Sequence, residues 1–191
     1  MIIRIDDVSI NTDMHDLSKQ IDYWHKFVPS VKFIIGINLI AKSNNEFSVY
    51  PNPPFKKRDR PFFYDVDSII DKSWFDDIAV SRDEIASHGL IHVDHSLLSY
   101  DAQEMSIVSS CNILGSKKFI PPFNQYNAYT ESVCKKYGIE LIGNTDTIRW
   151  KSLETHDFDP NYEYWYYHPW RVNAHSLKRR FFQINHETVT R

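Results

Sequence analysis

The sequence predicts a single α/β domain that spans residues 1–191. Short apolar runs end in polar or acidic residues, and stretches with helical spacing separate them, which is the pattern of alternating strands and helices. A chain of 191 residues can bury a sizeable core as one domain. Its hydrophobic content of 42% and charged content of 25% are those of an ordinary globular protein.

The expected elements alternate along the chain. Residues 31–39 are rich in β-branched side chains, which favour a strand, and residues 17–27 have an amphipathic helical pattern. Asp101 and Glu104 have the spacing of a capping box, which predicts that a helix starts at Asp101. Strands are expected at 2–5, 31–39, 84–87, 117–120, 140–143 and 164–167, and helices at 17–27, 68–78, 101–114 and 128–137.

Proline and glycine mark several of the breaks. The strand at 117–120 stops at Pro121 and Pro122, because proline cannot donate a hydrogen bond to a neighbouring strand. Gly138 ends the helix before it. Residues 44–64 contain four prolines, a basic run and several aromatic side chains, and predict a long inserted loop or lid.

Composition excludes several classes of function. A net charge of -3 and a pI near 6.3 give no general attraction for nucleic acid or anionic membranes. Cys111 and Cys134 are too few and too far apart for a CxxC metal site or a disulfide scaffold, so both are expected to be buried thiols. There is no secretory signal pattern and no apolar run of ~18 residues, which predicts a cytoplasmic protein without a membrane span.

The strongest local signal is a pair of histidines, His88 and His92, that follows a short strand. On a helical turn, four-residue spacing would put both imidazoles on one face, where they can share a metal ion. An isolated pair of this kind more often packs or faces solvent. Asp6 and Asp7 follow the first strand, so one carboxylate can bind the cation while the other accepts a proton from water.

These residues belong to a series of motifs that resembles the polysaccharide deacetylase (NodB-like) family, also described as carbohydrate esterase family 4. The match runs over nearly the whole chain. The resemblance implies a distorted or incomplete (β/α) barrel with one divalent cation, commonly zinc, in a surface groove. The motifs are Asp6-Asp7, Glu84-Ile85-Ala86-Ser87-His88 with His92, Phe119-Ile120-Pro121-Pro122-Phe123-Asn124, and Tyr166-Tyr167-His168.

The resemblance also implies a role for each motif residue. Asp6 corresponds to the general base and His168 to the general acid, and the backbone N–H of Phe123 would stabilise the oxyanion. The hydrophobic and aromatic positions are expected to contact the acetyl group or the sugar. The implied metal ligands are Asp7, His88 and His92, and the implied substrate contacts are Trp150, Tyr166, Tyr167 and Trp170.

The chain departs from the family at the residue that pairs with the base. Ile120 stands where the family usually has an arginine. Arg4, two positions before Asp6 and so on the same strand face, or Arg149 can replace it. We favour Arg149, because the family keeps an acid at that position and the two changes together indicate an exchange of charge partners.

The same exchange leaves His168 without the acid that orients it, and Asp146 is the expected replacement. The predicted function is therefore metal-dependent hydrolysis of the N-acetyl group of an amino sugar. The N-acetylated sugar or oligosaccharide would be a surface-polysaccharide or lipopolysaccharide precursor. The alternatives are a hydrolase of another non-peptide C–N bond and a non-catalytic carbohydrate-binding member of the same fold.

Overall fold

The computed structural model describes residues 1–9, 12–39, 84–90 and 92–177. In these ranges seven parallel strands form one sheet, in the order β5-β4-β3-β2-β1-β7-β6. The sheet is curled, and within these ranges it has open edges at β5 and β6, which confirms the predicted incomplete (β/α) barrel. The strands are β1 (Ile2–Val8), β2 (Lys32–Ile37), β3 (Glu84–Ser87), β4 (Lys118–Phe119), β5 (Glu140–Leu141), β6 (Lys151–Ser152) and β7 (Tyr164–Tyr167).

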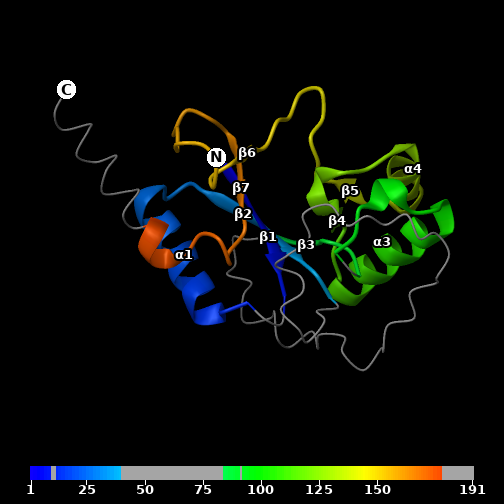
Figure 1. Ribbon diagram of the computed structural model, residues 1–191, viewed down its shortest axis with the longest axis horizontal. Coiled ribbons are helices and arrows are strands. Elements are labelled where there is room, and N and C mark those ends of the chain that lie inside the picture. Colours follow the sequence, from blue (N-terminus) through cyan, green and yellow to red (C-terminus); the bar gives the residue numbers. More distant parts are fainter. Residues whose placement is uncertain (10–11, 40–83, 91, 178–191) are drawn as a thin grey trace.

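Helices lie on both sides of the centre of the sheet, α1 near β1 and β2, and α3 with α4 near β3 to β5 (Figure 1). Asp13 caps α1 by accepting a hydrogen bond from the backbone N–H of Asp16. Gly115 and Gly138 follow α3 and α4 in the left-handed conformation that such helix ends favour. The described part of the chain contains the helices α1 (Met14–Phe27), α3 (Tyr100–Leu114) and α4 (Ala128–Tyr137) and the short 3₁₀ helices η3 (His95–Leu97) and η4 (Pro122–Asn124).

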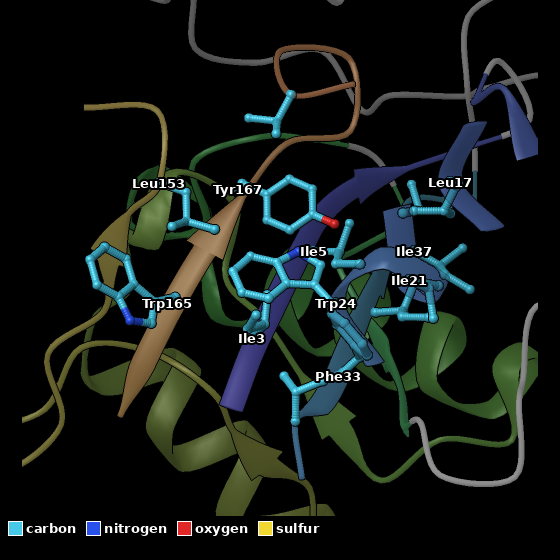
Figure 2. Packing of buried hydrophobic residues seen from close by; sticks show 14 of the residues in the cluster. Ile3, Ile5, Leu17, Ile21, Trp24, Phe33, Ile37, Leu153, Trp165 and Tyr167 are labelled. Carbon is cyan, nitrogen blue, oxygen red and sulfur yellow. The ribbon is translucent and has the colours of Figure 1, made fainter. Parts of the chain in front are cut away.

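The outer face of the central strands forms the main core. Alternate residues of β1, such as Ile3 and Ile5, pack with Phe33 of β2 and with Trp24 of α1. Figure 2 shows this cluster, in which Tyr167 of β7 lies among the same buried side chains. A second cluster joins α3 and α4 to β4, and its members are Ile107, Cys111, Phe119, Val133, Cys134 and Ile139. Both cysteines are buried and free, as expected.

The strand residues that alternate with those of the main core lie on the inner face of the sheet. Ile34, Ala86, Ile120 and Ile142 form a small buried cluster there. Arg4 pairs in register with Ile34 on one side and with Tyr166 on the other, which places it in the middle of this face. The curled sheet therefore holds a buried arginine inside, next to the residues that follow the strands.

A β-bulge interrupts β1 at the two adjacent aspartates. Ile5 pairs with Ile35 and Val8 pairs with Ile37, so Asp6 and Asp7 together lie opposite the one residue between 35 and 37. Asp7 has a φ of 61°, a left-handed conformation that is uncommon for a residue other than glycine. The bulge returns Val8 to the buried core and leaves the extra residue, Asp7, outside the regular alternation.

Several local predictions need correction. Ser99, not Asp101, caps α3, because its side chain accepts from the N–H of Ala102 and the helix starts at Tyr100. The short strand β6 was not predicted. The expected loop at 44–64 and helix at 68–78 lie outside the described residues. Within the described ranges, no helix is long and apolar enough to cross a membrane.

Candidate metal centre and active site

Three side chains converge near the carboxyl end of β1 and just after the carboxyl end of β3. Nε2 of His92 lies 2.9 Å and Nε2 of His88 lies 3.2 Å from Oδ1 of Asp7. One candidate ligand atom from each of these residues lies within 4.8 Å of the other two. The residues predicted as metal ligands are therefore brought together around one point.

The two histidines do not lie on a helical turn, contrary to the reasoning from their spacing. β3 ends at Ser87, and the chain continues through Gly89, whose φ is 90°. Nδ1 of His88 lies 2.8 Å from the backbone oxygen of Ile120. Since a carbonyl oxygen can only accept, Nδ1 must carry a hydrogen.

This hydrogen bond tests whether the site fits a cation. With Nδ1 protonated, a neutral His88 has a lone pair on Nε2, and that lone pair faces Oδ1 of Asp7. Two acceptors 3.2 Å apart repel unless a proton or a metal ion lies between them. A carboxylate and two imidazole nitrogens with open positions are the donor set of catalytic zinc sites, so these residues fit a divalent cation.

The charge state of Asp7 agrees with that function. Burial raises the pKa of Asp7. When a proton and not a cation lies between Asp7 and each histidine, the hydrogen bonds and charges of His88 and His92 outweigh burial and hold that pKa well below its usual value. Asp7 is therefore ionised at neutral pH, as a metal ligand must be.

Asp6 is held by Arg4 and not by Arg149. Nη2 and Nε of Arg4 donate to Oδ2 of Asp6 at 2.8 and 3.1 Å, and both residues are buried. Oδ1 of Asp6 is buried without a partner among the described residues. Arg149 is exposed in the segment before β6, so the preferred prediction was wrong and its alternative, Arg4, makes the contact.

The Arg4 guanidinium also contacts a backbone oxygen and two aromatic rings. Nη1 donates to the backbone oxygen of Ile142 at 3.1 Å, and the charge lies 4.9 Å from the centre of the Trp150 ring and 5.1 Å from that of Tyr166. These contacts stabilise a buried cation in addition to its carboxylate partner. Arg4 therefore occupies the inner face as a fixed part of the site.

His168 is oriented by Glu154, and not by Asp146 as predicted. Oε1 of Glu154 lies 2.6 Å from Nδ1 of His168 and also accepts from its backbone N–H at 2.9 Å. Burial lowers the pKa of His168, but the hydrogen bond to Glu154 and the charge of Asp7 outweigh it and raise that pKa above its ordinary value. Asp146 is exposed in the loop that precedes β6.

Glu154 is a functional residue that sequence reasoning missed. Burial raises its pKa, and the hydrogen bond and charge of His168 more than offset this, so the pKa of Glu154 is lower than usual. Arg171 donates to its other oxygen at 3.2 Å. The available signal was an acid four positions after Trp150, in a stretch where the family places the partner of this histidine.

No known family's sequence profile matches the chain, and no curated protein matches it. Several solved structures, however, match the chain in fold. A CE4 family pseudoenzyme from Bacillus anthracis has a TM-score of 0.60 at 11% identity, covering 98% of this chain and 61% of its own. A family 4 carbohydrate esterase from Streptomyces lividans, in complex with acetate, has a TM-score of 0.60 at 12% identity, covering 97% of this chain and 87% of its own. The fold is that of the family 4 carbohydrate esterases.

A further family 4 structure supports the same assignment of fold. An acetyl xylan esterase from Clostridium thermocellum, in complex with cobalt, has a TM-score of 0.50 at 13% identity, covering 97% of this chain and 84% of its own. The chain spans about three fifths of the length of the Bacillus anthracis pseudoenzyme. The resemblance seen in the sequence is therefore confirmed at the level of the fold.

On this carbohydrate esterase fold, Phe123 lies directly beside His92 of the candidate metal centre. Its ring centre is 4.3 Å from that of His92, and its φ is 58° within η4. Asn124 has a similar φ of 55°, so two successive residues are left-handed. Such strained backbone is common at functional sites, and here it occurs in the turn that carries Phe123.

The residues predicted to contact substrate divide into two groups. Trp150 and Tyr166 lie on the inner face around Arg4, and Trp170 is half exposed, with Nε1 3.4 Å from Oδ2 of Asp7. Tyr167 is fully buried in the main core, so its predicted substrate contact was wrong. The reason is the alternation of β7, which turns Tyr166 inward and Tyr167 outward.

Proposed function

We propose that the protein is a metal-dependent deacetylase that hydrolyses the N-acetyl group of an amino sugar in a glycan or glycan precursor. One observation carries this proposal. Three residues that could hold a cation, Asp7, His88 and His92, lie next to Asp6 and His168. Asp6 is a buried carboxylate with one oxygen that has no partner among the described residues, and His168 is an imidazole with a raised pKa. These are the parts needed to bind a carbonyl, activate water and protonate an amine.

Each side chain has a separate task in the hydrolysis. A divalent cation, most simply zinc, held by Asp7, His88 and His92 would polarise the acetyl carbonyl and acidify water. Oδ1 of Asp6 accepts the proton of the attacking water, while Arg4 holds Oδ2.

The remaining groups act on the intermediate and the leaving group. The backbone N–H of Phe123 donates to the developing oxyanion. Protonated His168, oriented by Glu154, donates its proton to the sugar nitrogen as the C–N bond breaks. The products are acetate and a free amine.

The test is release of acetate from N-acetylated sugar oligomers by the purified protein, before and after metal removal. We expect turnover that disappears with chelator and returns on addition of zinc. Hydrolysis of a cyclic amide without release of acetate would favour the alternative C–N hydrolase. Acetate release that persists in full after the metal has been removed would contradict the proposal.

A non-catalytic carbohydrate-binding protein is the second candidate, and two observations favour it. Ile120 replaces the arginine that the family motif usually contains, and one protein of the same fold is a pseudoenzyme. The Arg4 contact to Asp6 argues against this candidate, because it supplies the missing guanidinium. Sugar binding without any acetate release in the presence of zinc would establish it. The identity of the sugar and the cytoplasmic location stay predictions.

A further inference from the structure

Asn38 lies at the end of β2, directly beside the bulge that contains Asp7. Its backbone N–H donates to the backbone oxygen of Val8 at 2.9 Å, just beyond the bulge. Its side-chain Nδ2 lies 3.3 Å from Oδ1 of Asp7. The residue is only 7% exposed, so the contact is shielded from solvent.

The orientation of the Asn38 amide follows from its partner. A carboxylate oxygen can only accept, so the Asn38 nitrogen and not its oxygen must face Asp7. Oδ1 of Asn38 then remains buried without a partner among the described residues, which costs free energy that an apolar side chain would avoid.

Gln20 carries a similar buried amide outside the site, and the comparison shows how Asn38 differs. Nε2 of Gln20 donates to Oδ2 of Asp16 at 2.7 Å, and Oε1 of Gln20 is also buried without a partner in the described part of the chain. An orphaned amide oxygen alone therefore does not mark function. The difference is that Asn38 contacts a carboxylate proposed to bind a cation.

Asp7 needs a donor that is not itself a ligand. Nε2 of His88 and of His92 contact Oδ1 of Asp7, but these nitrogens cannot bind a cation and donate to Asp7 at the same time. Asn38 can do so, because its Nδ2 is not a ligand atom. Near Oδ2, Trp170 is half exposed and its contact is long at 3.4 Å, and Nε2 of His168 is 3.6 Å away.

We propose that Asn38 is a positioning residue for the metal centre, which holds the Asp7 carboxylate by its Oδ1 so that the group presents a fixed lone pair to the cation. The inference rests on the proposed function only in that a cation must bind at Asp7. Hydrogen bonds of this kind to ligands typically raise metal affinity by about 10–100-fold.

The experiment compares zinc dissociation constants of the wild-type protein, Asn38→Leu and Asn38→Ala, measured by competition with a chromophoric chelator. We expect both variants to bind zinc about 10–100-fold more weakly. Gln20→Leu is the matched control, because it removes an equivalent buried amide contact to an aspartate outside the site. It should alter unfolding of the zinc-free protein while the zinc affinity stays that of the wild type.

Unfolding of the zinc-free proteins, followed by circular dichroism, separates positioning from folding. If either folded Asn38 variant binds zinc as tightly as the wild type, the inference is wrong while the proposed function stands. An equal loss of affinity in Gln20→Leu would also overturn it, since the loss would then follow from stability. A wild-type protein that binds no zinc would overturn the proposed function and the inference together.

Discussion

Replacing Arg4 by methionine should lower the free energy of unfolding by about 3–5 kcal/mol, the usual cost of leaving one member of a buried ion pair without the other. The guanidinium donates twice to Oδ2 of Asp6 and once to the backbone oxygen of Ile142. Arg4 is fully buried and the side chain of Asp6 is only 4% exposed, so water cannot replace these contacts. Methionine replaces the apolar stem of arginine but not its guanidinium, so the loss comes mainly from the charge and its hydrogen bonds.

A double variant separates charge from packing. Replacing a whole buried ion pair by apolar residues is often neutral or stabilising, so Arg4→Met with Asp6→Leu should be more stable than Arg4→Met alone. Both variants should lose turnover, because Asp6 is either misoriented or absent. For Arg4→Met the loss should approach the contribution of a general base, about two to four orders of magnitude.

The assays are urea unfolding of the zinc-free proteins and acetate release with zinc present. Arg149→Met is the matched control, because Arg149 is exposed, and its stability should change by no more than about 0.5 kcal/mol. If Arg4→Met keeps wild-type stability and turnover, Arg4 does not hold the base. A severe loss of turnover in Arg149→Met would restore the partner first favoured from the sequence.

Four further changes test other parts of the site and fold. His88→Ala should abolish stoichiometric zinc, measured by metal analysis, and a full equivalent retained would contradict the ligand assignment. Asp6→Asn should keep zinc but lower turnover by about two to four orders of magnitude, because an amide cannot accept the proton of water. Glu154→Gln should lower the kinetic pKa of His168, since the charge that helps to raise it is lost, so the alkaline limb of the pH profile should move to lower pH. Burial lowers the pKa of His95 from 6.5 to about 4, so the unfolded chain binds this proton more readily between those values. The free energy of unfolding should fall by roughly 3 kcal/mol as the pH drops through that window, and His95→Gln should remove this dependence.

The two-residue alternation of side chains along β-strands predicts two features of the site correctly. Arg4 and Asp6 are two residues apart on one strand, so a shared face follows directly from the alternation. The same rule separates Tyr166 from Tyr167, of which Tyr167 is in the core. Arg149 was preferred on the pattern of family motifs, but it lies in an exposed segment outside any strand.

Other features depend on contacts that no local pattern contains. Glu154 contacts His168, which is fourteen residues later in the sequence. The two residues are brought together because they follow β6 and β7. The bulge at Asp7 is visible only when β1 is paired with β2. The spacing of His88 and His92 was informative even though the helical turn assumed for it was wrong, because a loop also brings both nitrogens to Asp7.

The position of Arg4 explains how a guanidinium can lie beside Asp6 on the inner face although position 120 is an isoleucine. Ile120, which follows β4, packs closely against β2, two strands away: a Cβ on Gly36 would lie 3.0 Å from Cδ1 of Ile120, so the isoleucine fills the space that a side chain at 36 would need. It is fully buried and carries no charge that would require a partner. Arg4 meets Asp6 within one strand, two residues away, so the pair forms whenever β1 is in place and does not depend on the turn after β4. The backbone oxygen of Ile120 still serves the site, because it accepts from Nδ1 of His88 and so fixes the tautomer that leaves Nε2 free for a cation. The side chain at 120 can therefore change from cationic to apolar while its backbone keeps a role at the metal centre, and the guanidinium is supplied from β1.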